Sequence, residues 1–289
     1  MIEKSKLINS WIEINKNFPF KNYINQDRKS GYFDMVKKVS KWIKPGGKIL
    51  DFGCGPCDKT AMFSLSGYNV TAYDTFEDAW HKQDNNEKKI FNFAKKSKIK
   101  LITGNFKELK RKVKNEKFDV IMAHDVFEHF HSSPRIVLNH LLSNLKSGGF
   151  LIISVPNAAN LRKRISIFFG KTNYNRYDYF YWYPGFWNGH VREYVKNDLK
   201  QLNFFLKLDQ KEISSYHLQL DVLPSFLRKP FVLISNMMPS IRDTWMLVSA
   251  KPKSWKPQFI PSKKQIKKSL GWHYFDISKY KYNWFDQSH

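Results

Sequence analysis

Short apolar segments and amphipathic helical segments alternate along the first 156 residues of this chain. Apolar runs of strand length lie at 48–52, 69–73, 99–103, 118–123 and 150–155. Helical spacing of apolar residues or helix-ending glycines predicts helices at 32–43, 60–67, 76–96 and 134–146. Such an alternation requires a parallel sheet covered on both faces. The pattern therefore predicts an α/β fold whose ligand site lies at the carboxyl ends of the strands.

After residue 156 the alternation breaks down. Residues 191–203 look helical, 204–209 look strand-like, and 244–250 form a clean final strand. We expect a domain at 45–250 that carries substrate insertions at about 157–190 and 213–240. An N-terminal helical segment (1–44) precedes it, and a basic aromatic tail (251–289) follows it. We interpret residues 218–238 as a packed insert, with an amphipathic helix at a membrane interface as the alternative.

The turn after the first strand is the most informative motif. Gly53 and Gly55 let the backbone turn sharply and approach a ligand closely. Asp74 ends the next strand, near the offset at which an acid binds a ribose hydroxyl. Asp58 stands where a dinucleotide fingerprint has its third glycine, and its charge would oppose a pyrophosphate. The motif therefore favours a nucleoside ligand that carries no phosphates.

The same turn contains Cys54-Gly-Pro-Cys57, which is also a thioredoxin-type redox motif. Gly53 stands where that motif usually has tryptophan, and the chain is far longer than a thioredoxin. We therefore interpret the two cysteines as residues that fill the turn. They are the chain's only cysteines, so a disulfide framework is excluded.

With these residues in place, the chain resembles class I S-adenosylmethionine-dependent methyltransferases, most closely the ubiquinone-biosynthesis O-methyltransferase-like group. The resemblance covers roughly residues 30–250. It rests on the turn at 51–55, Asp74, and the segments 104–106, 124–129, 154–157 and 189–194. It implies a Rossmann-like seven-stranded sheet, mostly parallel with an antiparallel last strand. It also implies S-adenosyl-L-methionine as cofactor, bound by Asp51, Gly53, Cys54, Gly55, Asp74, Asn105, Phe106, His124 and Asp125.

Methyl transfer to oxygen requires in-line alignment and a group that removes the acceptor's proton. We expect His129, Glu128 and His190 to be catalytic, with His129 as the base because histidine titrates near neutral pH. The alternative role of Glu128 and His129 is to orient their loop. A second alternative joins Asp125 to these three residues as a Mg, Mn or Zn site. We do not expect a divalent cation, and the metal ligands stay undefined.

The formal net charge of +24 favours an anionic partner. Residues 88–117 carry a net charge of +10 and residues 251–289 carry +7. We expect an enzyme that methylates a small-molecule, glycan or lipid-like acceptor, at oxygen. An RNA 2′-O-methyltransferase is the first alternative, with RNA as its partner. A catalytically silent relative that binds a polyanion is the second.

The sequence also indicates where the protein resides. The N-terminal residues lack an apolar run of signal-peptide length, and no run of about 18 apolar residues occurs that would indicate a spanning helix. We therefore expect a cytoplasmic protein without a transmembrane segment. Peripheral attachment to a membrane surface is the alternative.

Overall fold

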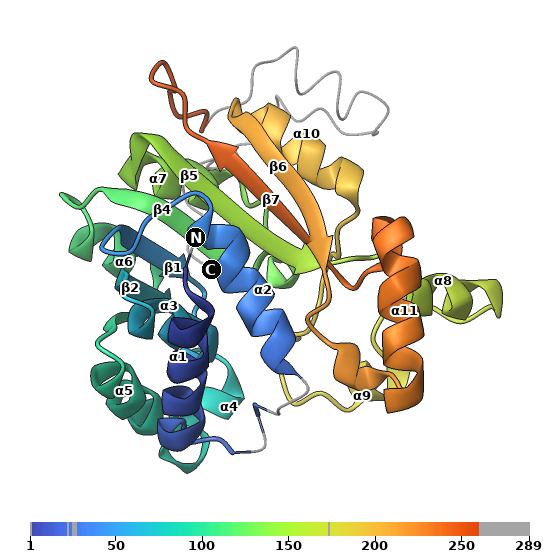
Figure 1. Ribbon diagram of the computed structural model, residues 1–289. Helices are drawn as coiled ribbons and strands as arrows, with labels where there is room; N and C mark the ends of the chain where they lie inside the picture. Colours follow the sequence, from blue (N-terminus) through green and yellow to red (C-terminus); the bar gives the residue numbers. More distant parts are fainter. Residues whose placement is uncertain (1, 22, 25–27, 173, 260–289) are drawn as a thin grey trace.

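The computed structural model describes residues 2–21, 23–24, 28–172 and 174–259. A seven-stranded sheet in the order β3-β2-β1-β4-β5-β7-β6 forms its centre (Figure 1). The strands are β1 (Lys48–Phe52), β2 (Asn69–Asp74), β3 (Lys100–Thr103), β4 (Phe118–His124), β5 (Leu145–Pro156), β6 (Asp209–Tyr216) and β7 (Thr244–Ala250). β7 runs antiparallel to both of its neighbours, whereas the pairs from β3 to β5 are parallel. The predicted mostly parallel sheet with an antiparallel last strand is confirmed.

Two apolar layers cover the sheet, because successive strand residues point to opposite faces. In β1, for example, Ile49 belongs to one buried cluster and Leu50 to the other. The first cluster includes residues of α1 (Lys4–Asn17), α2 (Lys29–Ser40), α3 (Asp58–Leu65) and α5 (Asn86–Lys96). The second includes residues of α6 (Phe106–Lys112), α7 (Arg135–Asn144) and α10 (Lys196–Leu206). The N-terminal helices therefore share one core with the sheet.

Three further helices gather at one side of the molecule, near the end of the sheet that carries β7 and β6 (Figure 1). They are α8 (Leu161–Phe168), α9 (Tyr177–Tyr181) and α11 (Ser225–Met237). All lie within the two segments expected as insertions. Among the described residues, no helix combines the length and the apolar character that crossing a bilayer requires.

Three local predictions were wrong. The strand-like segment 204–209 instead continues α10 to Leu206, and the sixth strand, β6, begins at Asp209. An apolar run of three residues cannot distinguish a helix end from a strand. The expected single helix at 76–96 is divided into α4 (Ala79–Lys82) and α5, because Asp84 and Asn85 adopt left-handed backbone angles (φ 47° and 57°). The segment 218–238, which we interpreted as a packed insert, is largely the helix α11, in which only Ser235 is buried.

The expected basic tail lies largely outside the described residues, which end at 259. Of its first part, Trp255 donates a hydrogen bond from its indole nitrogen to the Leu206 carbonyl (2.9 Å). The division of the chain at residues 44 and 250 stays a prediction.

Candidate functional site

A cavity of about 280 Å³ lies at the carboxyl ends of β1 and β4. Six residues predicted to bind the cofactor line it: Asp51, Gly53, Cys54, Gly55, His124 and Asp125. His129 also lines it. The position agrees with the rule that ligands of open α/β sheets bind at this edge.

The glycine turn forms one wall of the cavity. Gly53 has φ +76°, and its backbone nitrogen donates to the Tyr73 carbonyl (2.8 Å), which joins the turn to β2. A Cβ atom at Gly53 would lie 2.4 Å from Cγ2 of Val126, in the loop after β4. Only glycine fits this backbone angle and this close approach.

Two acids support the turn. Asp51 is buried and accepts a hydrogen bond from the Thr60 hydroxyl (2.6 Å), and burial raises its pKa to about 7. Asp74 accepts a hydrogen bond from the Gly55 nitrogen (2.8 Å) and does not line the cavity. The structure therefore brings Asp74 beside the turn, where it fixes the conformation of Gly55.

Two predicted cofactor residues lie away from this cavity. The Asn105 side chain accepts a hydrogen bond from the Glu108 nitrogen (3.2 Å) and caps α6. The Phe106 ring packs edge-on against Phe52, with a centroid distance of 6.1 Å. Neither residue lines the cavity, so their contact with the cofactor stays a prediction.

The cysteines of the turn are buried, and their sulfur atoms lie 3.7 Å apart. Burial raises the pKa of the Cys54 thiol well above its usual value, which disfavours the reactive thiolate. Cys57 adopts a left-handed backbone (φ 67°) directly before α3. This burial supports the interpretation that both residues fill the turn.

Sequence reasoning missed a charged group at the base of the cavity. Lys59 pairs with Asp125, and the Tyr32 hydroxyl donates to Asp58. Lys59 lies in the first turn of α3, where a cation is unfavourable unless it is paired. The position of Lys59 at the start of a predicted helix was the sequence feature that could have indicated a paired cation. Tyr23, Arg28 and Tyr32 line the same cavity, but no spacing in the sequence connects them to the glycine turn.

Replacing Lys59 with methionine should lower the free energy of unfolding by about 2 kcal/mol, because the half-buried Asp125 loses its cation. Urea unfolding measures this. Lys146→Met is the matched control, since its pair with Asp119 is far more exposed, and we expect it to cost less than about 0.5 kcal/mol. Adding Asp125→Asn to Lys59→Met should restore much of the stability. Equal losses in the two single variants would contradict the assignment.

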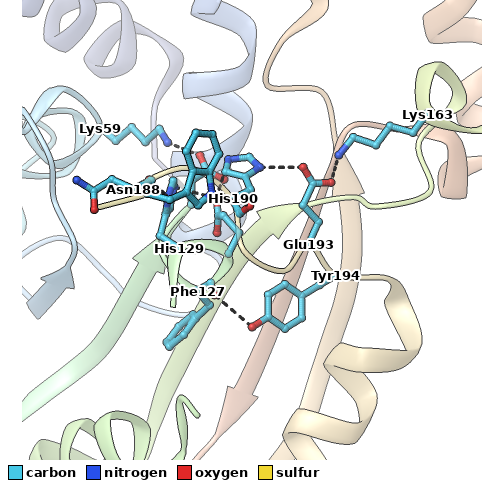
Figure 2. Close-up of polar contacts among 11 residues, drawn as sticks. Lys59, Phe127, His129, Lys163, Asn188, His190, Glu193 and Tyr194 are labelled. Carbon is cyan, nitrogen blue, oxygen red and sulfur yellow. Dashed lines mark hydrogen bonds and ion pairs between the residues drawn. The ribbon is translucent and has the colours of Figure 1, made fainter. Parts of the chain in front are cut away.

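The three predicted catalytic residues, Glu128, His129 and His190, meet beside the cavity that His129 lines. Figure 2 shows the two histidines next to each other. The Glu128 Oε1 atom lies 4.0 Å from Nε2 of His129 and 4.0 Å from Nε2 of His190. The two imidazole rings are 5.0 Å apart. The backbone carbonyl of Glu128 accepts hydrogen bonds from Val191 (2.6 Å) and Arg192 (3.1 Å), so the loops at 126–129 and 189–192 are tied together.

The hydrogen bonds of both imidazoles place a proton on each Nδ1 atom. His129 Nδ1 lies 2.8 Å from the Asn188 carbonyl, which can only accept, so this nitrogen donates. His190 Nδ1 donates to Glu193 (2.8 Å), whose other oxygen pairs with Lys163 of α8 (Figure 2). Burial lowers the pKa of His190 to about 4, which keeps it neutral. The Nε2 atom of His190 therefore presents a lone pair toward Glu128.

Glu128 is fully buried, and within the described part of the chain neither carboxylate oxygen has a hydrogen-bond partner. Burial raises its pKa well above the usual value. A carboxyl group and two imidazole nitrogens fit either a proton or a divalent cation between them. Asp125 does not join this cluster, because it pairs with Lys59, so the four-residue metal set reduces to three.

The comparisons with known proteins define the class. A sequence profile described as "Methyltransferase domain" matches residues 24–203, more than half of the chain. The chain therefore belongs to this family of proteins with a methyltransferase domain. The resemblance stated from its motifs is confirmed.

Within this class, the chain is similar to the ubiquinone biosynthesis O-methyltransferase of Rickettsia prowazekii. The two are 30% identical over 155 residues, which cover 53% of this chain and 56% of that protein. The enzyme of the same name from Rickettsia bellii is 28% identical over 153 residues, with 53% and 59% covered. The chain thus spans less than two thirds of the length of these curated relatives.

Solved structures agree with the fold. A SAM-dependent methyltransferase from Archaeoglobus fulgidus superimposes with a TM-score of 0.51, at 13% identity, over 83% of this chain and 99% of that one. An N-methyltransferase from Bradyrhizobium japonicum, solved with S-adenosyl-L-homocysteine, gives 0.50 at 12% identity, over 86% and 99%. At such identities the likeness concerns the fold alone.

Proposed function

We propose that this enzyme transfers the methyl group of S-adenosylmethionine to a hydroxyl oxygen of a small-molecule acceptor. The observation that carries the proposal is the cluster of Glu128, His129 and His190 beside the cofactor cavity. Oxygen acceptors need a group that removes their proton, and this cluster offers imidazole nitrogens for that role. The names of the Rickettsia relatives support oxygen as the acceptor atom.

The cofactor's amino-acid part would lie against the glycine turn, with Asp51 beneath it. Asp74 would bind the ribose. Its Oδ2 atom accepts from Gly55 and its Oδ1 atom from Phe76, and each oxygen keeps a second lone pair for a sugar hydroxyl. His124 and Asp125 would face the methionyl group from the end of β4.

In the proposed mechanism, the acceptor oxygen attacks the methyl carbon in line with the departing sulfur, and the S–CH₃ bond breaks as the O–CH₃ bond forms. The acceptor's proton passes to Nε2 of His129. The hydrogen bond from Nδ1 to Asn188 holds the ring in position and disperses the charge that the ring gains. The products are the methyl ether and S-adenosylhomocysteine.

An apolar cavity adjoins the proposed cofactor cavity. It favours an acceptor molecule that carries an apolar group. It has a volume of about 280 Å³ and is lined by Leu161 and Ile165 of α8, Phe231 of α11 and neighbouring aliphatic residues. Gln219 lines both cavities. An acceptor could therefore place an apolar group between α8 and α11 while its hydroxyl approaches His129.

The first test is calorimetric titration with S-adenosylmethionine and S-adenosylhomocysteine. We expect micromolar binding, which Asp51→Ala and Asp74→Ala should each weaken about tenfold or more through lost hydrogen bonds. Simple phenols and catechols are then supplied with methyl-labelled cofactor, because a phenolic proton is within reach of an imidazole base. Unchanged cofactor affinity in both variants would refute the proposed cofactor site.

The cluster also fits a divalent cation, held by Glu128, His129 and His190. Such an ion would act as a Lewis acid on the acceptor hydroxyl. If it binds there, zinc or manganese added to chelator-treated protein should raise the melting temperature. Glu128→Gln should remove most of that rise, whereas Glu108→Gln, on the exposed α6, should keep it. A similar rise in all three proteins would refute the site.

A further inference from the structure

Most of the exposed large apolar side chains in the described part of the chain lie in three segments at one side of the molecule (Figure 1). The segments are α8 with residue 169, the stretch 174–186 around α9, and α11 with residue 238. The side chains are Ile165, Ile167, Phe168, Phe169, Tyr174, Tyr177, Tyr179, Phe180, Tyr181, Trp182, Phe186, Phe226, Leu227, Leu233, Ile234, Met237 and Met238. We call this set the apolar face.

The helix α11 shows how unusual this exposure is. A surface helix normally buries its apolar stripe against the core. In α11 the only buried residue is Ser235. Phe226, Leu233 and Met237, spaced along one face of the helix, are 75%, 67% and 82% exposed. Exposed apolar patches of this extent mark an interaction site.

The residues around the apolar face are basic. Arg162, Arg164 and Lys171 accompany α8, and Lys229 lies in α11, all of them exposed. Asp178, the acid within α9, is paired with Arg176. A surface with this sign of charge complements anionic headgroups, and it would repel a second copy of itself.

We propose that α8, α9 and α11 form a docking surface for a lipid bilayer that carries anionic headgroups. Tyrosine and tryptophan side chains, abundant around α9, prefer the boundary between headgroups and hydrocarbon. Lysine and arginine complete this pattern by binding lipid phosphates while their stems cover apolar surface. The docked helices would lie in the plane of the interface.

The aliphatic side chains favour a bilayer over a nucleic acid. RNA-binding surfaces use aromatic rings on which bases stack, with cations that follow the backbone. Ile165, Ile167, Leu233, Ile234 and Met237 offer no ring to a base. They gain free energy only by entering an apolar phase, which hydrocarbon supplies.

The inference does not rest on the proposed acceptor, although the two agree. The apolar cavity between α8 and α11 lies next to the apolar face. Docking would therefore bring this cavity toward the bilayer. Vesicle binding needs neither cofactor nor turnover, so a failure of the proposed reaction would leave this test valid.

The test is sedimentation of the full chain with vesicles. One set contains phosphatidylcholine alone, and the other contains phosphatidylcholine with about one third phosphatidylglycerol. We expect clear binding to the anionic vesicles and at least tenfold weaker binding to the neutral ones, falling as salt is added. The double variants Phe168→Ser/Phe169→Ser and Phe226→Ser/Met237→Ser should each weaken binding about tenfold or more.

Matched controls distinguish vesicle binding through the apolar face from nonspecific binding through other exposed apolar or basic side chains. Phe204→Ser/Phe205→Ser alters two exposed rings on α10 (75% and 52% exposed) and should leave vesicle binding unchanged. Lys171→Gln/Lys229→Gln should weaken binding about fivefold for each lysine, more than Lys95→Gln/Lys112→Gln on α5 and α6. The circular dichroism spectrum and the urea unfolding midpoint of every variant verify that it is folded.

Vesicle binding that persists in both apolar double variants would overturn the proposal and assign the binding to another basic segment. An equal loss in the Phe204/Phe205 control would also overturn it. The proposal would also be overturned if the protein bound a uridine homopolymer through the apolar face and did not bind anionic vesicles.

Discussion

Replacing Gly53 with alanine should weaken binding of S-adenosylhomocysteine by about a hundredfold and destabilise the protein by about 3 kcal/mol. Two costs add at this position. An alanine must adopt a left-handed backbone (φ +76°), and its Cβ must lie 2.4 Å from Val126. Val126 is β-branched, and both its methyl groups crowd the site, so rotation cannot clear the contact. The turn would move out of the cavity that it lines.

Gly148 provides the control for this variant. It has the same backbone angle (φ +76°), but no heavy atom lies within 4 Å of where its Cβ would be. Gly148→Ala should therefore cost only about 1 kcal/mol, from the backbone alone, and leave cofactor affinity unchanged. Adding Val126→Ala to Gly53→Ala should recover part of the lost affinity. If Gly53→Ala binds cofactor as Gly148→Ala does, the close-approach argument is wrong.

Replacing His129 with alanine should lower kcat for a phenolic acceptor by about a thousandfold, while S-adenosylhomocysteine affinity changes only a few-fold. The proposed base is lost, but the glycine turn and both acids that support it are intact. Initial rates with methyl-labelled cofactor, together with calorimetry, separate these two effects. Loss of cofactor binding in parallel with activity would indicate that His129 only shapes the cavity.

His131 is the matched control, because it lies two residues away and its Nε2 atom also donates a hydrogen bond to a backbone carbonyl, that of Trp187 (2.8 Å). It does not belong to the cluster of Glu128, His129 and His190. His131→Ala should therefore change kcat by no more than about twofold. An equal loss of kcat in His129→Ala and His131→Ala would contradict the assignment of His129 as the base.

Much of the fold and part of the candidate site follow from sequence patterns. Buried strand segments read as continuous apolar runs because both faces of a parallel sheet are covered, and the runs at 48–52 and 150–155 are such cases. The glycine turn was predictable because the conformation of Gly53 excludes other residues. The end of α10 was not, because its apolar run at 204–206 suits a helix and a strand equally.

The partners of the site residues were less predictable. Asn105 follows a strand, as cofactor residues do, yet its side chain caps α6, since a helix start competes for the same side chain. Asp125 was grouped with Glu128 because two carboxylates and two imidazoles together suit a divalent cation. The left-handed backbone at Asp125 (φ 57°) and the pairing with Lys59 separate their carboxylates in space.

By itself the sequence determined the layered α/β architecture, the edge of the sheet that carries the site and the glycine turn, because each depends on periodicity or on one local backbone angle. The sequence predicted Glu128, His129 and His190 as catalytic residues, but only the tertiary structure decided how their side chains meet across about 60 residues of chain. Only the tertiary structure brought Arg28 and Tyr32 to the cavity. It also decided that α11 buries almost nothing. Contacts between distant loops, and the exposure of an apolar stripe, depend on what the rest of the chain places beside them, which no local pattern records.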